Sequence, residues 1–164
     1  MAIEIKQMET EDEIRGKAYV HWYSWHTVYA GLVDQAYLDQ LTLGKMEEKA
    51  FQWRDNILVA KDGDRVVGFT GFGKSGEAGP EAGEIFALYV LSEYFGTGLG
   101  LQLMNAALKQ LRDYRIIRVW LLKENKRAYR FYQKCGFAPD GNEKLSKVGA
   151  VGIRMTLNRS LANL

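Results

Sequence analysis

The chain has 164 residues, of which 47% are hydrophobic and 26% charged, a composition typical of a soluble globular protein that buries a full core. Its 22 Lys and Arg nearly balance its 20 Asp and Glu, and it contains neither a basic cluster for nucleic acid or membranes nor an apolar run long enough for a transmembrane helix. A single cysteine and two separated histidines exclude an internal disulfide and offer no metal-ligand spacing, while the Glu-rich start argues against a signal peptide, so we expect a cytoplasmic protein without a bound metal.

The first half of the chain alternates between strand and helix patterns. Ile3 and Ile5 alternate with charged residues, as in a half-buried strand. Thr10 and Glu13 have the spacing of a capping box, which predicts that a helix begins there. In chain order we expect a strand at 2–7, a helix after Thr10 with Ala18, Trp22, Trp25, Tyr29 and Leu32 on its apolar side, short helices at 34–43 and 45–53, and strands at 57–61 and 66–72 joined by the hairpin turn Asp62-Gly63-Asp64.

The second half repeats a strand–helix alternation without an internal repeat or a linker. The expected elements are an exposed Gly-rich loop at 74–83, an apolar strand at 84–91, a helix at 99–114, a strand at 116–122, a helix at 126–135 and a final strand at 148–157, whose partner begins at 137–139. We therefore expect one α+β domain over residues 1–164, with any functional site at the C-terminal ends of its strands.

A glycine-rich turn, Phe95-Gly96-Thr97-Gly98-Leu99-Gly100, lies directly between an expected strand and an expected helix. Glycines allow a sharp turn and a close approach to a ligand, and the N–H groups at a helix start form an anion site suited to a pyrophosphate. The spacing is not that of a dinucleotide-binding fingerprint, and the Lys-Ser/Thr pair of a Walker loop is absent. A plain tight turn is the alternative interpretation.

A second motif runs from Asn125 to Phe137 with the sequence NKRAYRFYQKCGF. Local rules explain much of it: Asn125 is a helix N-cap, Gly136 ends the helix, and Phe137 packs back on it. On that interpretation Tyr132 is an ordinary core aromatic residue.

Together the two motifs resemble the GNAT (Gcn5-related N-acetyltransferase) superfamily. The turn is similar to its cofactor motif Gln/Arg-x-x-Gly-x-Gly/Ala, and 125–137 matches its later motif Asn-x-x-Ala-x-x-Phe-Tyr-x-x-x-Gly-Phe throughout. The resemblance implies an α+β fold with a mixed, mostly antiparallel central sheet, flanked by helices and with a splayed fourth strand. One residue departs from the pattern: Phe95 stands where the family has Gln or Arg, which removes a side-chain donor but leaves the backbone cradle.

The resemblance also implies acetyl-CoA as co-substrate and assigns roles to individual residues. The strand backbone at Leu88, Tyr89 and Val90 would bind the pantetheine arm, which Asn125 orients. Tyr132 would donate a proton to the departing thiolate, a role that a well-placed phenol can fill. The residues that would hold the pyrophosphate are Gly96, Thr97, Gly98, Leu99, Gly100 and Leu101.

A base or a water chain must also deprotonate the acceptor amine. Glu84, at the start of the same strand, is the first carboxylate candidate, although a solvated strand-end charge is an equal alternative, and Glu124 is a weaker rival. The backbone N–H of Val90 is the expected oxyanion donor. Cys135 lies on the apolar side of its helix, so we interpret it as a small core residue and not as an acyl carrier.

These inferences predict an N-acetyltransferase that transfers an acetyl group to a primary amine of a small molecule or peptide. A non-catalytic acyl-CoA-binding or sensing module on the same fold is the main alternative. The acceptor is not specified, although His21, Tyr23 and His26 lie off the apolar stripe and are candidates to face a substrate or a partner subunit. We also expect a homodimer, because the apolar final strand would be a liability if it were exposed.

Overall fold

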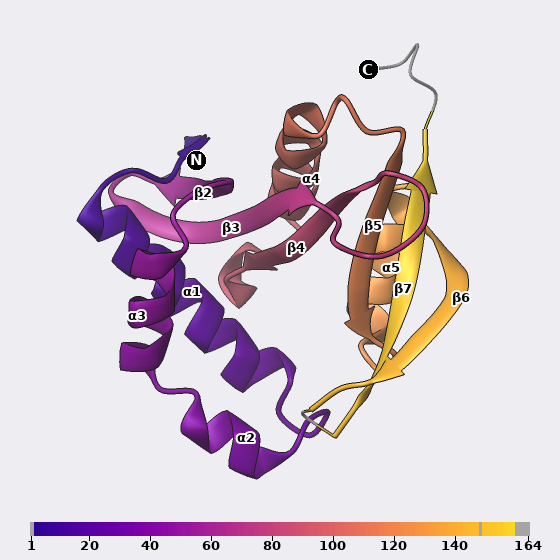
Figure 1. The fold of residues 1–164 in the computed structure, drawn as a ribbon. Coiled ribbons are helices and arrows are strands. Elements are labelled where there is room, and N and C mark those ends of the chain that lie inside the picture. The colour runs from indigo at the N-terminus through magenta and orange to yellow at the C-terminus, as the bar shows by residue number, and fades with distance from the viewer. Residues whose placement is uncertain (1, 148, 160–164) are drawn as a thin grey trace.

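A computed structural model describes residues 2–147 and 149–159 and shows a twisted sheet between two sets of helices (Figure 1). The elements are β1 (Ile3–Gln7), α1 (Glu11–Val28), α2 (Gln35–Gln40), α3 (Leu43–Gln52), β2 (Ile57–Asp62), β3 (Arg65–Lys74), β4 (Gly83–Val90), the short 3-10 helix η1 (Ser92–Tyr94), α4 (Leu99–Gln110), β5 (Ile116–Leu122), α5 (Lys126–Lys134), β6 (Ala138–Leu145) and β7 (Val151–Asn158).

The sheet is antiparallel except at its centre. Its seven described strands lie in the order β1-β2-β3-β4-β5-β7-β6, and only β4 and β5 run parallel. These two strands pair only where Gly83–Ile85 lies beside Ile117–Val119, and then they diverge (Figure 1). The expected α+β fold, with a mostly antiparallel sheet and a splayed fourth strand, is therefore confirmed.

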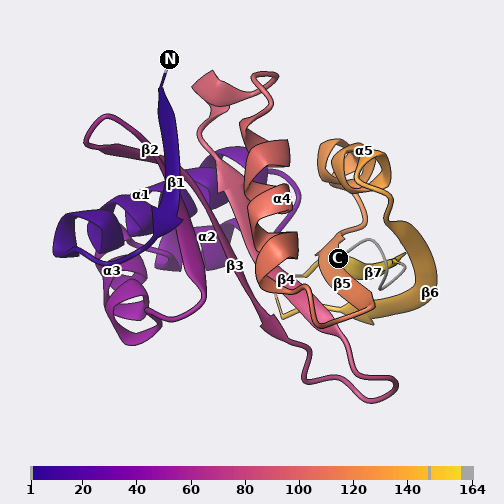
Figure 2. The same ribbon diagram turned by 90° about the horizontal axis from the view of Figure 1, so that it is seen from above.

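Helices cover both faces of the sheet (Figures 1 and 2). Phe69 of β3 points toward α1, where its ring contacts His21, whereas the neighbouring position Gly68 faces Leu103 of α4. This opposition follows from the alternation of side chains along a strand. Helix α5 lies on the same side as α4 and packs over β5 and β7, so α4 and α5 together border the place where β4 and β5 separate.

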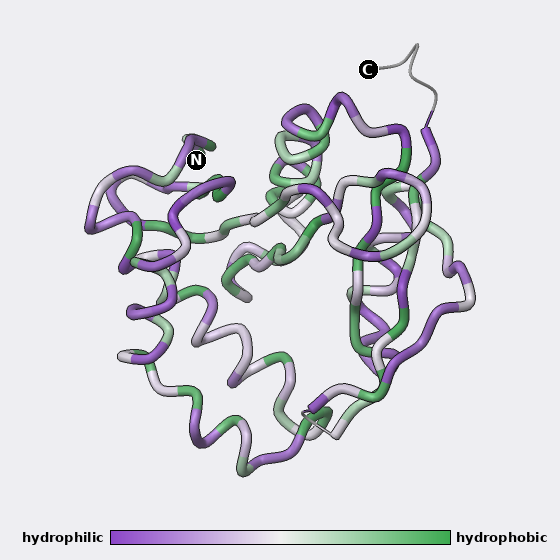
Figure 3. Tube along the Cα trace, in the orientation of Figure 1, coloured by the Kyte–Doolittle hydropathy of each residue, from purple (hydrophilic) through white to green (hydrophobic). Residues whose placement is uncertain are grey.

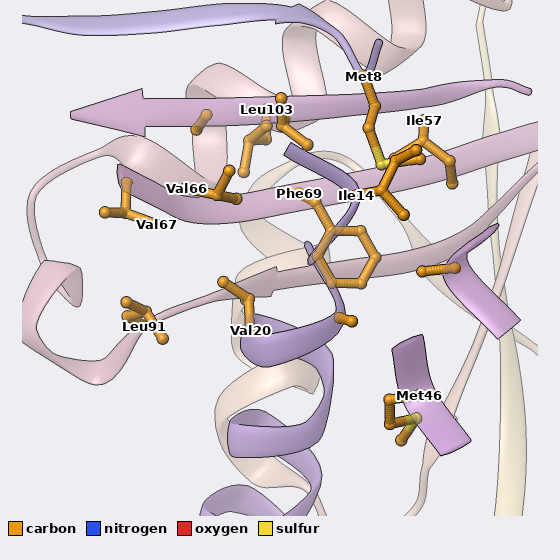
Figure 4. Packing of buried hydrophobic residues seen from close by; sticks show 14 of the residues in the cluster. Met8, Ile14, Val20, Met46, Ile57, Val66, Val67, Phe69, Leu91 and Leu103 are labelled. Atoms are coloured by element: carbon orange, nitrogen blue, oxygen red, sulfur yellow. The ribbon is translucent and has the colours of Figure 1, made fainter. Parts of the chain in front are cut away.

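Two hydrophobic cores hold these layers together. The first lies between α1, α3, α4 and strands β1–β4, with the fully buried Phe69 and Ile14 near its centre (Figure 4). The second lies between α4, α5 and the β5–β7 half, and contains Tyr132 and Phe137. Along α1 and α4 hydrophobic and hydrophilic residues alternate, as expected for helices with one buried side (Figure 3). No helix in the described ranges is long and apolar enough to cross a membrane.

Local sequence rules explain most element boundaries. Thr10 and Glu13 form the expected capping box at the start of α1, and the Asp62–Asp64 turn joins β2 to β3. Helix α4 is shorter than expected and ends at Gln110, because Leu111 caps it and enters the second core while the chain turns toward β5. The last strand begins at Val151; the expected first residue, Val148, lies outside the described residues.

The last strand is not exposed at the edge of the sheet. Strand β7 pairs with β5 on one side and with β6 on the other, so its backbone is satisfied within its own chain. The edge is β6, whose residues are all exposed and whose pairing is interrupted between Pro139 and Glu143. An irregular, polar edge resists pairing with another chain. The reason for expecting a homodimer through this strand was therefore wrong, and a dimer stays a prediction without a described interface.

Candidate active site

The separation of β4 from β5 opens a cavity of about 790 Å³. Its walls come from the C-terminal part of α1, from β4 after the point of divergence, from β5 and from the start of α5. The glycine turn before α4 closes one end. The cavity therefore lies where strands of an α/β arrangement usually leave a ligand site, at their C-terminal ends.

One backbone edge of β4 faces this cavity. The N–H of Leu91 donates to the carbonyl of Val67 (2.9 Å), so this peptide group points toward β3. Successive peptide groups of a strand point in opposite directions, which turns the N–H of Val90 and of Leu88 away from β3 and toward the open side. With β5 diverged, this edge offers hydrogen bonds to an extended ligand.

A β-bulge bends β4 at the point where this strand separates from β5. Ile85 pairs with Phe72 and Ala87 pairs with Gly71, which leaves Phe86 as an extra residue in β4. Phe86 is 57% exposed and lines the cavity. Bulges of this kind bend a strand and are common beside functional sites.

The glycine turn meets the cavity with little more than backbone. Gly96 and Gly98 have φ values of 76° and 87°, and nothing lies within 4 Å of a Cβ built on either. Gly98 is the N-cap of α4 and provides no side-chain cap, and the N–H of Leu99 donates to the hydroxyl of Thr97 (3.4 Å). Among the described residues the N–H groups of Gly100 and Leu101, which line the cavity, have no such partner and stay available to a ligand. These N–H groups and the helix dipole favour an anion at this end of the cavity.

The motif at 125–137 supplies the opposite wall. Asn125 caps α5 by accepting a hydrogen bond from the N–H of Ala128 (3.2 Å), as the local interpretation predicts, and it also lines the cavity. Gly136 has a φ of 99°, and Phe137 packs beside Tyr132 in the second core. The local interpretation of this motif is correct and leaves room for a ligand-binding role.

Tyr132 is buried but its side chain reaches the cavity wall. Burial raises the pKa of Tyr132, and the nearby Tyr29 raises it further. Across the cavity the hydroxyls of Tyr29 and Tyr89 lie 3.1 Å apart, joining α1 to β4. Burial also raises the pKa of Tyr89, and the nearby Tyr132 raises it further. All three phenols therefore keep their protons at neutral pH and can act as donors.

The two candidate carboxylates lie in different places. Glu84 is at the start of β4, is 9% exposed, and is not among the residues that line the cavity. Burial raises its pKa, opposed by a hydrogen bond with Ser75. Glu124 follows β5 and lines the cavity together with Tyr132. The structure therefore places Glu124, and not Glu84, at the cavity, because Glu84 lies where β4 is still paired with β5.

The side of α1 that faces the cavity was not the expected one. His21 stacks on Tyr89 with ring centroids 5.4 Å apart, and His26 Nε2 lies 2.7 Å from the carbonyl of Leu41. Neither these residues nor Tyr23 line the cavity. A helix turns by about 100° per residue, so positions one or two further on face a different wall. The α1 residues that do line it are Ser24, Thr27 and Val28.

Two lining residues were not singled out from the sequence. Trp120 of β5 borders the cavity, and its indole N–H donates to Glu77 of the β3–β4 loop. Arg127, two residues after Asn125, also borders it. Its position within the second motif was the feature of the sequence that could have indicated a place at the cavity.

The potential metal ligands of the described residues are dispersed, and the single cysteine is a core residue. Within residues 2–147 and 149–159, no three His, Cys, Asp or Glu side chains are grouped to hold a metal ion. Cys135 is the C-cap of α5 and packs against the second core, and burial raises the pKa of its thiol. A thiol of this kind is not activated as a nucleophile.

Most of the chain is similar in sequence to uncharacterized or probable N-acetyltransferases. Residues 18–137 match the family model of the acetyltransferase (GNAT) family. An uncharacterized N-acetyltransferase of Mycobacterium bovis is 37% identical over 90 residues, a match that spans 54% of this chain and 56% of that relative. A probable N-acetyltransferase of Mycobacterium tuberculosis is 30% identical over 155 residues, which covers 87% of each chain.

The fold agrees with this relationship. The crystal structure of PaiA N-acetyltransferase from Thermoplasma acidophilum in complex with coenzyme A superposes with a TM-score of 0.71, over 96% of this chain and 99% of that one. At 20% identity this likeness shows the shared fold alone. Because the family model and the Mycobacterium tuberculosis relative both cover most of the sequence, the chain belongs to the acetyltransferase (GNAT) family.

Proposed function

We propose that the protein is an acetyl-CoA-dependent N-acetyltransferase acting on a primary amine of a small molecule or peptide. The observation that carries the proposal is one cavity that unites an open strand edge, a glycine turn at a helix N-terminus and the buried phenol of Tyr132. Each part fits a different portion of the co-substrate.

The residues present fit coenzyme A. The space beside Gly96 and Gly98 that a Cβ would enter, and the N–H groups of Gly100 and Leu101 that follow, suit a pyrophosphate. The open edge of β4 at Leu88 and Val90 suits the amide groups of a pantetheine arm. The PaiA relative was crystallised with coenzyme A, which supports the same ligand here. Acetyl-CoA, when bound, supplies the acetyl group as an activated thioester.

The chain's own groups then account for the transfer. The N–H of Val90, on the open edge, is placed to donate to the carbonyl oxygen as negative charge develops on it. Tyr132 keeps its proton at neutral pH and can donate it to the leaving sulfur. Glu124 is the carboxylate that lines the cavity, so we propose it, in preference to Glu84, as the group that takes the proton from the acceptor amine, directly or through a water.

The acceptor end is mainly aromatic and hydroxylated. Tyr29, Phe86 and Trp120 line it together with Thr27, while Glu124 provides a negative charge. A protonated amine is attracted both by aromatic faces and by a carboxylate. This lining favours an amine carried on an apolar group over a polyamine, which would require several acids.

Binding and turnover measured together test the proposal. Thermal shift with CoA, ATP and NAD should show stabilisation by CoA alone, because a ligand that binds only the native state raises its stability. Release of free thiol from acetyl-CoA, followed across a panel of amines, should then identify acceptors. Stabilisation by ATP or NAD without CoA would exclude the proposal, and CoA binding without turnover on any amine would favour the non-catalytic module.

A further inference from the structure

The position of Phe95 is the starting point for a further inference, which rests on the proposed function. Phe95 directly precedes Gly96, is 38% exposed and lines the cavity. A phenyl ring offers no hydrogen-bond donor to a phosphate. The turn therefore lacks a side-chain cation of its own at the residue that enters the pyrophosphate site.

A cation from another element lies on that ring. The guanidinium carbon of Arg127 is 3.2 Å from the centroid of Phe95, and Arg127 also lines the cavity. Arg127 comes from the start of α5, more than thirty positions along the chain. A planar guanidinium stacked on an aromatic face keeps its N–H groups in the plane, pointing outward, in the geometry that matches phosphate oxygens.

Packing holds Arg127 beside the glycine turn. A Cβ added to Gly100, in the first turn of α4, would lie 3.2 Å from the ring of Phe131, four residues after Arg127 on α5. Helix α5 therefore contacts the turn at two points, through Phe131 on Gly100 and through Arg127 on Phe95. Gly100 lacks a side chain because α5 comes this close, which separates its role from that of Gly96 and Gly98.

Within residues 2–147 and 149–159, no acidic or acceptor group is paired with the Arg127 guanidinium. Among the described residues Arg127 takes part in no salt bridge and no hydrogen bond, and its pKa is lowered by burial and by the like charge of Arg130. A guanidinium normally finds acceptors for its five N–H groups. A stacked and unpaired arginine that lines a cavity is therefore suited to bind an anionic ligand.

We propose that Arg127, supported on Phe95, is the side-chain ligand of the CoA diphosphate in this protein, in the place of a cation at position 95. The site thus combines the backbone N–H groups of the turn with a guanidinium from α5. The same arrangement makes Phe95 a positioning residue, because its ring fixes the plane of the guanidinium.

The test removes the charge of Arg127 and keeps an apolar side chain beside Phe95. Arg127→Met retains an apolar stem on Phe95 and removes the guanidinium, and Arg130→Ala removes a charge from the same helix outside the cavity. Calorimetric titration should give a Kd for CoA about 10- to 100-fold weaker for Arg127→Met, the loss expected for charge-assisted hydrogen bonds, and a Kd within about twofold of the wild type for Arg130→Ala.

Ligand fragments identify which phosphate is bound. Arg127→Met should weaken CoA and 3′-dephospho-CoA by the same factor and leave pantetheine binding unchanged. An effect on CoA that is lost with 3′-dephospho-CoA would assign Arg127 to the 3′-phosphate and overturn the inference. An unchanged Kd for CoA would also overturn it, whereas failure of the wild type to bind CoA at all would instead exclude the proposed function.

A rescue experiment distinguishes ligand binding from mere packing of α5. Adding Phe95→Arg to Arg127→Met places a guanidinium back at the turn, and we expect most of the lost affinity to return. If Arg127 only clamped α5, the double variant would bind CoA no better than Arg127→Met, and the ligand-free protein would lose thermal stability in both.

Discussion

The two ends of the cavity are made of different parts of the protein. At the cofactor end the contacts are offered by backbone, from the turn at Gly96 and Gly98 and from the open edge of β4. At the proposed acceptor end they are offered by side chains that come from separate elements, such as Tyr29 at the C-cap of α1, Trp120 of β5 and Glu124 after β5. One end is thus defined by local chain geometry and the other by tertiary packing.

This difference explains why the cofactor is easier to infer than the acceptor. A backbone cradle requires glycine at fixed spacings, and such spacings are visible in a sequence. An aromatic wall requires only that some side chains of suitable size meet in space, and many sequences satisfy that. If the comparison is correct, changes at the two ends should have separable effects on CoA affinity and on turnover.

The largest effect on CoA affinity is expected from Gly98→Glu at the cofactor end. Gly98 has a φ of 87° and open space where its side chain would lie. A glutamate there would place a negative charge in the pyrophosphate site, so the affinity for CoA should fall by about 100-fold or more. Calorimetric titration with CoA measures this loss.

Gly141→Glu is the matched control for backbone strain. Gly141 has a φ of 88° and also open space around it, but it lies in β6, outside the cavity. Both variants should lose about 1 kcal/mol of stability from the left-handed conformation. Equal losses of CoA affinity in the two variants would show that strain, and not the charge at the turn, is responsible.

Tyr132→Phe should separate chemistry from binding. The variant keeps the ring in the second core and removes the proton donor, so kcat should fall by roughly 100- to 10,000-fold while the Kd of CoA stays within about twofold. Tyr129→Phe, on the same helix but outside the cavity, serves as the control. An unchanged kcat in Tyr132→Phe would reduce Tyr132 to a packing residue.

Replacing either of the two candidate carboxylates, Glu124 and Glu84, should have a smaller effect on the kinetics, and the pH profile distinguishes between them. Glu124→Gln should lower kcat/KM by about 10- to 100-fold and flatten the acidic limb of its pH profile, because the group that accepts the amine proton is lost. Glu84→Gln, outside the cavity, should leave that limb in place. The reverse result would return the base to Glu84 and would mean that the acceptor reaches further along β4 than the cavity does.

The smallest effect on function is expected from Glu13→Gln, far from both ends. The Glu13 carboxylate is 3% exposed, caps α1, and accepts hydrogen bonds from Lys6 (2.8 Å) and Lys61 (3.1 Å). Burial opposes its ionisation, but these lysines and two backbone N–H groups lower its pKa from 4.5 to about 2. The change to Gln should cost roughly 1–2 kcal/mol of stability at pH 7 and leave the Kd of CoA unchanged.

The pH dependence of that cost has a definite sign. Because the pKa of Glu13 is lower in the folded state, the unfolded chain binds more protons between pH 4.5 and about 2, and the contribution of Glu13 is lost as the pH falls through this range. Chemical denaturation of wild type and Glu13→Gln should therefore converge near pH 2. A difference that stays constant down to pH 2 would show that the carboxylate charge is not the cause.

Much of the fold could be predicted because its signals are local. The capping box of Thr10 and Glu13 and the turn after Asp62 each act within a few residues, and both are present. The end of α4 was placed too late because the apolar spacing continues to Leu111, although the chain already turns there toward β5. The partner strand expected to begin at 137–139 is present as β6, but the sequence does not reveal that β5 pairs with the other edge of the final strand.

The features of the site also divide into those with a local sequence pattern and those without one. The glycine turn and Tyr132 lie at one cavity, as the two motifs predict, because each motif carries its own geometry. Glu84 was favoured over Glu124 because it belongs to β4, but Glu84 lies where β4 still pairs with β5, whereas Glu124 lines the cavity. The stack of Arg127 on Phe95 joins residues 32 positions apart and leaves no local pattern.

Amide chemical shifts of the uniformly 15N-labelled protein, recorded before and after addition of CoA, test the central claim most directly. We expect the largest shifts at the backbone amides of residues that line the cavity, those of Gly98, Gly100 and Leu101 and of Leu88 and Val90, with little change at Glu84 or in β6. Shifts concentrated elsewhere, or no shifts at saturating CoA, would contradict the assignment of this cavity as the acetyl-CoA site.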